Sequence, residues 1–287
     1  MIGTVDSFRR PLGQHIGGEI HMDKLWIDRL ELANFRCFSN ITVDFDEQLT
    51  VLVAPNGAGK TSILDAVAIT LGPFVGAFDE SVSSHAARSD IRLVRARKTK
   101  SNEMELALGG ARFAARGNVP GRGSSTWQRS LATSTDSRTT VKDAKVLTEY
   151  GKQLQDQTRT ENGTVILPVV AFYGTGRLWK LKKLTNRKLE RTSRTVGYTD
   201  CLDPGSSYKA FSEWFGYWST SIMVLQMEAA QRGEPYAPNE FLDYRRSVKR
   251  AVDACLTPSG WSDLEFDYGY GELVAKHQEH VCYRFRS

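Results

Sequence analysis

The fold is decided by the stretch Ala54-Pro55-Asn56-Gly57-Ala58-Gly59-Lys60-Thr61-Ser62. It fits the phosphate-binding loop pattern G-x-x-x-x-G-K-[ST], with Ala54 in place of the first glycine. The apolar run at 49–53 before the loop predicts a buried strand, and residues 62–71 after it carry apolar side chains at helical spacing. We expect Gly72-Pro73 to end that helix. A strand, a glycine-rich loop and a helix in this order predict a triphosphate site.

The residue types in the loop suit that chemistry. Gly57 and Gly59 can take positive φ, so that backbone N–H groups approach phosphate oxygens at the positive end of a helix. Lys60 can reach the β- and γ-phosphates, and Thr61 can offer its hydroxyl to Mg²⁺. The alternative is a glycine-rich turn that only links a strand to a helix, and the matching flanks on both sides disfavour it.

Composition sets broad bounds. The chain has 287 residues, 40% of them hydrophobic and 25% charged, which suits a soluble globular protein of one large or two small domains. The net charge of +5 favours anionic partners such as nucleic acid, although an ordinary basic surface explains it equally well. Four scattered cysteines without a CxxC pair indicate reduced thiols in a cytoplasmic protein. No apolar run is long enough to span a membrane, and the N-terminus does not resemble a signal peptide.

Strand patterns surround the loop. Alternating side chains predict strands at 25–34 and 41–45 and a hairpin of 91–97 with 104–108. The exposed face of that hairpin is expected to carry a basic patch made of Arg92, Arg95, Arg97, Lys98 and Lys100. This patch could bind nucleic acid, or it could simply be a strand face exposed to solvent. Residues 109–140 are rich in Gly, Ser, Thr and Arg and predict a mobile hairpin tip or insert.

The second half of the chain predicts helices and one apolar strand. Helices are expected at 141–157, 205–231 and 240–255, the last with a packing face of Tyr244, Val248, Ala251 and Cys255. The run 165–173 predicts a strand buried on both faces of a mostly parallel sheet. The turn after it would place Tyr173, Thr175 and Arg177 near the nucleotide, or serve as a simple glycine turn. A hairpin is expected at 264–275, and His277 with His280 suits a surface pair better than a metal site.

Two motifs together resemble a known family. Asn34-Phe35-Arg36-Cys37-Phe38, followed by a strand and the loop with Ile63-Leu64-Asp65-Ala66, looks like the start of an ABC-type ATPase head of the SMC, RecF and RecN kind. This resemblance covers about residues 24 to 276. More narrowly, Asp90-Ile91-Arg92 and the run 167–179 are similar to the ATPases of bacterial anti-phage systems, the Septu ATPase and its retron-associated relatives, which work beside an HNH endonuclease.

The resemblance implies an α/β fold, a P-loop NTPase of the ABC-ATPase type with a mixed sheet, an antiparallel β lobe and a helical region. Residues 1–22 would be a flexible arm, and 23–287 the N-terminal part of the ATPase domain, with an insert at about 91–140 and the helical region at about 205–255. ATP and Mg²⁺ are the implied cofactors, with Thr61 as the Mg²⁺ ligand. The implied nucleotide-binding residues are Arg36, Asn56, Gly57, Ala58, Gly59, Lys60, Thr61 and Ser62.

The sequence also departs from the family. It contains neither an L-S-x-G signature nor an apolar strand ending in Asp-Glu, the features that complete the hydrolytic site in this family. We therefore expect a truncated or frame-shifted product that binds ATP, and we assign no catalytic residue. The alternatives are a divergent carboxylate elsewhere in the chain or a missing half supplied by a second chain.

Three functions follow as hypotheses. The first is the ATPase subunit of an anti-phage defence complex, in which ATP-driven dimerisation or higher assembly of heads controls an HNH endonuclease. The second is a RecF- or SMC-like repair ATPase that clamps double-stranded DNA. The third is an ATP-binding module without hydrolysis.

Overall fold

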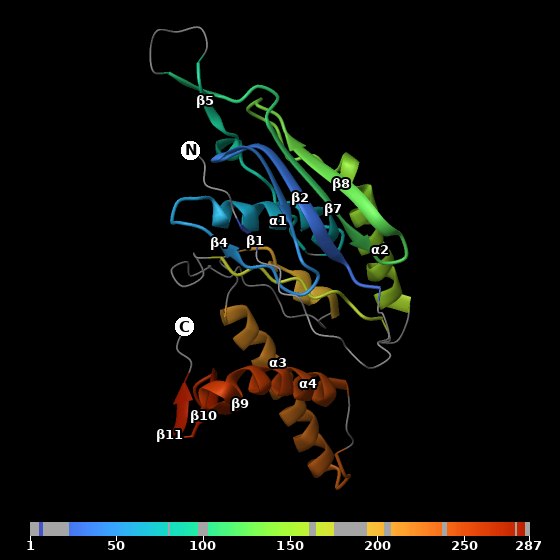
Figure 1. Ribbon diagram of the computed structural model, residues 1–287. Helices are drawn as coiled ribbons and strands as arrows, with labels where there is room; N and C mark the ends of the chain where they lie inside the picture. Colours follow the sequence, from blue (N-terminus) through green and yellow to red (C-terminus); the bar gives the residue numbers. More distant parts are fainter. Residues whose placement is uncertain are drawn as a thin grey trace, which may run out of the picture. The chain divides into compact units, whose positions relative to one another are not determined.

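The computed structural model describes residues 6–7, 23–79, 81–96, 103–160, 165–174, 194–203, 208–236, 240–278 and 280–284 (Figure 1). The chain divides into two compact units, which are described separately below. The first unit consists of residues 1–175 with 193–204, and the second of residues 176–192 with 205–287. The phosphate loop lies in the first unit.

A four-stranded antiparallel sheet is the centre of the first unit, with the strand order β3-β2-β7-β8. Its strands are β2 (Trp26–Phe35), β3 (Phe38–Asp44), β7 (Ala111–Val119) and β8 (Gly123–Leu131). Leu30, Leu32 and Phe113 are buried on its inner face, whereas Arg112 is exposed on the outer face. The predicted antiparallel β lobe and the strands at 25–34 and 41–45 are confirmed. Every strand pair in the described part of the chain is antiparallel.

Two helices contribute to the core beneath this sheet. They are α1 (Lys60–Val75) and α2 (Lys145–Thr160), and the 3-10 turn η2 (Lys142–Ala144) precedes α2. Ile63 and Ile69 of α1 and Leu147 and Leu154 of α2 belong to the same buried cluster as Phe113 of the sheet. The predicted helix at 141–157 is therefore confirmed.

Shorter elements complete the first unit. They are β1 (Asp6–Ser7), β4 (Leu52–Val53), η1 (Arg88–Asp90), β5 (Leu93–Arg95), β6 (Met104–Leu106) and η4 (Arg194–Tyr198). β1 pairs with β4, and β5 pairs with β6 as the expected hairpin. The rest of the predicted arm at 1–22 lies outside the described residues.

Both apolar runs predicted as buried strands differ from the prediction. Before the loop, β4 is only two residues long, and Val53 is 62% exposed. Residues 165–174 form no strand, and Val169 is 95% exposed. Pro168 has no amide to donate to a sheet, and its carbonyl oxygen accepts the Tyr198 hydroxyl at 2.6 Å. An apolar run becomes a buried strand only where layers cover both of its faces, and within the described residues these runs lack such cover.

The stretch 109–140, predicted as a mobile tip or insert, is instead structural. It contains β7 and β8, two of the four central strands. Its small residues fit the sheet closely, because a Cβ at Gly117 would collide with the carbonyl of Trp26 across the strand pair. The Gly- and Ser-rich composition therefore hides a strand pattern with alternating burial.

The end of α1 also differs from the prediction. The helix continues through Gly72 and Pro73 to Val75. Pro73 has no backbone N–H, so it cannot donate the hydrogen bond that the Ile69 carbonyl oxygen would accept in a regular helix. The Arg129 guanidinium of β8 donates to that carbonyl at 2.6 Å instead, and the Trp127 indole donates to the Thr70 carbonyl at 3.1 Å. Hydrogen bonds from two side chains of β8 thus satisfy carbonyl oxygens at the end of α1.

The second unit packs two helices with a three-stranded antiparallel sheet of order β11-β10-β9. Its elements are α3 (Tyr208–Gln231), α4 (Glu240–Leu256), η5 (Thr257–Ser259), β9 (Trp261–Asp267), β10 (Glu272–His277) and β11 (His280–Arg284). Phe215, Leu264 and Leu273 are its buried centre. The predicted helices at 205–231 and 240–255 and the hairpin at 264–275 are confirmed. No helix among the described residues combines the length and the apolar character needed to cross a membrane.

The packing face of α4 agrees with the prediction only in part. Val248 and Val252 pack on the core, while Ala251 and Cys255 are exposed. Lys249, which is not part of the predicted face, donates to Glu265 of β9 at 2.8 Å and also pairs with Asp263. The long stems of basic residues can lie along apolar surface while their heads reach carboxylates. Apolar spacing alone misses such a basic residue, so the face predicted from it is rotated around the helix relative to the observed packing face.

Candidate functional site: the phosphate loop

The loop between β4 and α1 has the backbone that phosphate binding requires. Gly57 has φ 81° and Gly59 has φ 94°, both in the left-handed region that side chains with a Cβ disfavour. The positive φ predicted for these two glycines is thus confirmed. The chain turns sharply in the loop and enters the first turn of α1 at Lys60.

A second constraint acts on Gly59. A Cβ built at this position would collide with the Phe38 ring and would lie 2.7 Å from the Cys37 sulfur. Gly57 has no such neighbour, since nothing lies within 4 Å of the equivalent position. The turn between β2 and β3, which contains Cys37 and precedes Phe38, therefore supports the loop from one side.

The N-terminus of α1 presents amides suited to an anion. The Ile63 amide donates to the Gly59 carbonyl at 3.1 Å, so the amides of Lys60, Thr61 and Ser62 precede the first bond of the helix. No side chain caps this end, and the first turn contains no acidic residue. Such an end attracts negative charge through the helix dipole.

The side chains of the loop take distinct positions. Lys60 donates from Nζ to the carbonyl oxygens of Ala54 at 2.6 Å and Pro55 at 2.9 Å, so its ammonium lies over the start of the loop. Asn56 and Thr61 are exposed, whereas Ser62 is 9% exposed. The structure thus brings the residues predicted from the motif together in one loop and helix turn.

Arg36 lies on the adjoining β2–β3 turn and is held by two acids. Its Nε donates to Asp90 at 2.8 Å, and its Nη1 pairs with Asp65 of α1. Burial would lower the pKa of Arg36, but the hydrogen bonds to Asp65 and Asp90 outweigh it and raise the pKa above its ordinary value. Its guanidinium also lies 4.9 Å from the centre of the Phe35 ring. The sequence assigned Arg36 to the site, whereas Asp65 and Asp90 stood in the quoted motifs without a role.

The segment expected beside the nucleotide is only partly described. Tyr173 is 65% exposed, while Thr175 and Arg177 lie outside the described residues. The neighbouring hydrogen bonds link 165–174 to the 194–203 segment, for example from the Phe172 amide to the Cys201 carbonyl at 2.9 Å. The proximity of this segment to a nucleotide remains a prediction.

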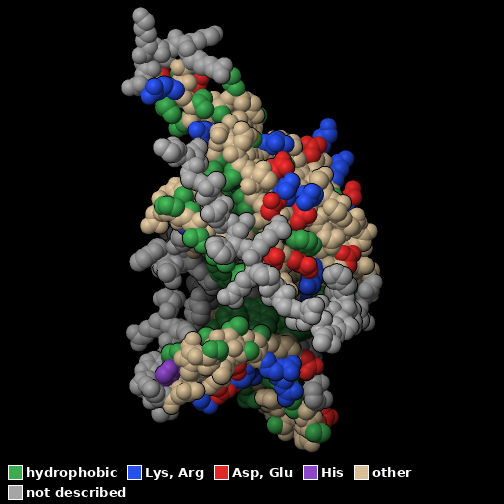
Figure 2. All heavy atoms as spheres, viewed as in Figure 1, with side chains coloured by type: hydrophobic (Ala, Val, Ile, Leu, Met, Phe, Trp, Pro, Cys, Tyr) green, Lys and Arg blue, Asp and Glu red, His purple; other side chains and the backbone are tan. Residues whose placement is uncertain are grey.

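Only two of the five residues of the predicted basic patch lie in the described part of the hairpin, and their surroundings differ. Arg92 is tied to the Cys37 carbonyl, and Arg95 is exposed on the same face as Leu93 and Met104. Arg97, Lys98 and Lys100 lie outside the described residues. Elsewhere, the view in Figure 2 shows basic and acidic side chains interspersed rather than a field of one sign. Among the described residues, no cluster of His, Cys, Asp and Glu suits a metal ion.

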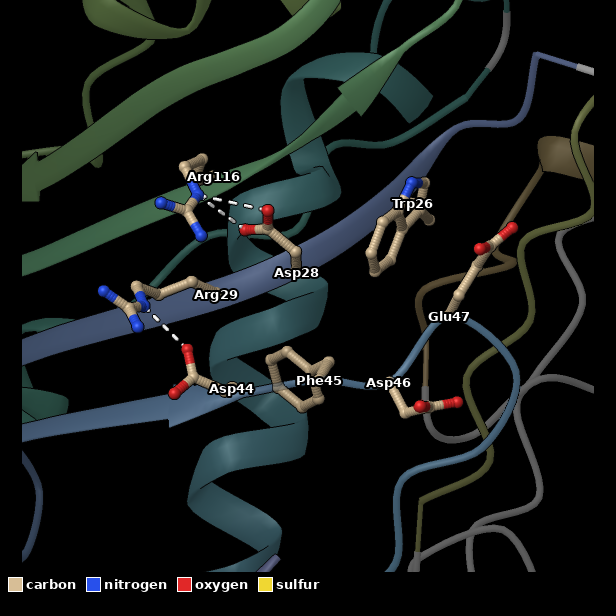
Figure 3. A pocket seen from close by; sticks show the side chains of 8 residues that line it. All are labelled: Trp26, Asp28, Arg29, Asp44, Phe45, Asp46, Glu47 and Arg116. Carbon is tan, nitrogen blue, oxygen red and sulfur yellow. Dashed lines mark hydrogen bonds and ion pairs between the residues drawn. The ribbon is translucent and has the colours of Figure 1, made fainter. Parts of the chain in front are cut away.

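A hollow of about 340 Å³ is lined by residues of β2 and β7 and by the end of β3 with the three residues that follow it (Figure 3). Its walls include Trp26 and Phe45, with the ion pairs Asp28–Arg116 and Arg29–Asp44. Each of these charges already has a partner within the sheet. The hollow contains none of the residues predicted to bind the nucleotide.

Comparisons with known proteins agree with the geometry of the loop. The model of the AAA domain family matches residues 29–232, well over half of the chain. The chain is 45% identical over 47 residues to the DNA double-strand break repair Rad50 ATPase of Methanopyrus kandleri, covering 16% of this chain and 5% of that protein. It is 39% identical over 46 residues to the chromosome partition protein Smc of Methanocaldococcus jannaschii, covering 16% and 4%.

A longer match is to the DNA replication and repair protein RecF of Streptococcus suis, 29% identical over 96 residues, covering 33% of this chain and 22% of RecF. The matched stretches thus span a small part of these relatives.

Proposed function

The chain belongs to the AAA domain family as an ATPase head of the SMC, RecF and Rad50 kind, and on that premise we propose that it binds MgATP at the Ala54–Ser62 loop to control a DNA-acting assembly. The geometry of the loop carries the proposal. Two glycines at positive φ lead into an uncapped helix N-terminus, and Lys60 lies across the loop. Few other backbones combine these features.

Each residue of the loop has a role in this proposal. Asn56 to Thr61 would surround the triphosphate with backbone amides, and Lys60 would leave its carbonyl partners for the β- and γ-phosphates. The exposed Thr61 hydroxyl suits Mg²⁺, which prefers a few protein oxygens together with water and phosphate oxygens. Mg²⁺ would neutralise charge between the phosphates. Arg36 and Ser62 would complete the surroundings of the nucleotide.

The finer proposal is a subunit of an anti-phage defence system. In it, ATP-driven dimerisation or higher assembly of heads would control an associated HNH endonuclease. Its support is the similarity of Asp90-Ile91-Arg92 and of the run 167–179 to the ATPases of such systems. A cytoplasmic location and contact with double-stranded DNA belong to the same proposal.

The relatives support a second candidate equally well. Rad50 and RecF are named for DNA repair, so a head that clamps duplex DNA when ATP is bound fits the same loop. Clamping would show as duplex binding that requires MgATP and weakens steeply with salt. ATP-dependent cleavage by a purified HNH subunit, added to this chain, would favour the defence role instead.

The test of nucleotide binding uses calorimetric titration of the 287-residue chain with MgATP. Lys60→Ala is expected to weaken binding at least about a hundredfold, since it removes a charge-assisted contact to two phosphates. Lys145→Ala, an exposed lysine at the start of α2, is the matched control and should bind as the unmodified chain does. Equal affinities for all three proteins, or no binding by the unmodified chain, would reject the proposal.

A further inference from the structure

The turn between β2 and β3 connects to the phosphate loop through packing. Phe38 fills the space where a Cβ of Gly59 would lie, so the loop rests on this turn. The backbone is unusual at this turn and just before it, because Arg36 of the turn and Asn34 near the end of β2 both have positive φ, at 49° and 54°. Such backbones cost free energy in residues with a Cβ and persist where surrounding contacts fix them.

Two carboxylates fix the Arg36 end of this turn. Asp90 accepts Arg36 Nε at 2.8 Å through one oxygen and the Ala87 amide at 2.8 Å through the other. The Arg36 amide also donates to the Asp90 carbonyl at 2.8 Å. The side chain of Asp90 is 17% exposed and that of Asp65 is 23% exposed, so solvent screens these pairs only in part.

Asp65 connects the turn to the helix of the loop. It lies four residues after Thr61 on α1, and residues at this spacing share one face of a helix. Side chains on a helix lean towards its N-terminus, which here is the end that adjoins the phosphate loop. The pair of Arg36 with Asp65 therefore ties the turn to α1 about one helical turn beyond Thr61.

We propose that Asp65 and Asp90 are positioning residues of the nucleotide site. They hold Arg36, and through it the turn that keeps Phe38 against Gly59, so that the phosphate loop retains its binding backbone. This inference rests on the proposed function. Because the α- and β-phosphates of ATP and ADP use the same loop, loss of this support weakens both nucleotides alike.

The experiment measures MgATP and MgADP affinity of the full chain by calorimetry for Asp65→Asn and Asp90→Asn. Each substitution keeps the side-chain shape and removes the charge. We expect both dissociation constants to rise in parallel by about tenfold, the scale of one charge-assisted hydrogen bond. Asp44→Asn is the matched control, since it breaks the 2.7 Å pair with Arg29 on the same sheet and should leave both affinities unchanged.

Two further variants sharpen the test. Phe38→Leu should reproduce the parallel loss, and the double variant with Asp65→Asn should be no weaker than the poorer single variant. If either Asn variant does not fold, Arg36→Lys, which keeps the charge but loses the planar fork, carries the same expectation.

Two results would overturn the inference. One is a loss confined to MgATP, which would mean that Arg36 reads the γ-phosphate directly. The other is a lower melting temperature with unchanged affinities, which would make the pairs purely structural. Both leave the proposed function intact, because that is rejected by different outcomes: no nucleotide binding by the unmodified chain, or equal affinities of the unmodified chain and Lys60→Ala.

Discussion

The guanidinium of Arg129 donates to the carbonyl oxygen of Ile69 at 2.6 Å, the acceptor that Pro73 leaves without an amide four residues later. Arg129 is fully buried, and its further acceptors are Ser84, Thr140 and His85. Burial lowers the pKa of the guanidinium to about 10. The residue remains charged at neutral pH and satisfies several carbonyls at once.

Replacing Arg129 is expected to be costly. Arg129→Met leaves buried carbonyls without donors and should lower the free energy of unfolding by about 3 kcal/mol. Arg112→Met is the control on the same sheet, where an exposed pair with Glu31 at 3.9 Å should contribute about 1 kcal/mol or less. Urea denaturation of both variants measures the difference. A loss for Arg129→Met no larger than for the control would contradict the role assigned to this residue.

His85 should make stability depend on pH. Its Nδ1 lies 3.0 Å from Arg129 Nη2, and because a guanidinium only donates, the ring accepts and is neutral. Partial burial of the ring and the charges of Arg129 and Arg138 lower the pKa of His85 below its ordinary 6.5. The unfolded chain then takes up this proton first, so stability is complete above about pH 6.5 and declines as the pH falls towards the lowered value. Thermal melts between pH 8 and 5 should show less of this decline in His85→Gln, and an identical decline would exclude His85 as its source.

Gly59 should tolerate no side chain. Gly59→Ala places a Cβ against Phe38 as well as forcing a left-handed alanine, and MgATP binding should weaken more than tenfold, given about 1–2 kcal/mol for the backbone alone. Gly109 has φ 84° with nothing within 4 Å, so Gly109→Ala carries the backbone strain without the collision. That control should lose some stability and keep its nucleotide affinity. Equal affinities in both variants would show that the contact with Phe38 is unimportant.

In the second unit, acid should weaken the packing of α4 on β9. Hydrogen bonds from Lys249 and Lys276 lower the pKa of Asp263 from 3.8 to about 2. The stabilisation is therefore present above about pH 4 and is lost as the pH falls towards 2. Asp263→Asn, which tolerates the positive φ of 58° at this position, should remove this acid dependence from melting curves between pH 5 and 2. Asp243→Asn, an exposed change on α4, should retain it.

Local patterns predicted the parts of the fold that local chemistry determines. The loop, its two strained glycines and the amphipathic helix α2 depend on residues close in sequence, and each was predicted correctly. The strand pattern of β7 was hidden because Ala and Gly, chosen by cross-strand contacts such as that of Gly117 with Trp26, resemble loop composition. The family motif pointed to Arg36, but the roles of Asp65 and Asp90 as its partners become visible only where three separate segments meet.

Proline produced the clearest error for the same reason. A proline ends most helices, and the prediction for Pro73 followed that rule. The exception requires a donor from another element, and Arg129 of β8 is 60 residues from the carbonyl that it satisfies. One signal was usable: a proline in the last turn of a helix leaves a carbonyl oxygen without an N–H donor. A side-chain donor from another element, such as a buried arginine, can satisfy that oxygen.

This arrangement also has a consequence for the order of folding. During synthesis, α1 leaves the ribosome well before β8, so its last turn at first lacks the donors that β8 supplies. Trp127 and Arg129 complete that turn only when the sheet closes over it. The end of the helix that begins at the phosphate loop is therefore completed by residues 57 and 60 positions away in the chain, and this requires a long loop to close.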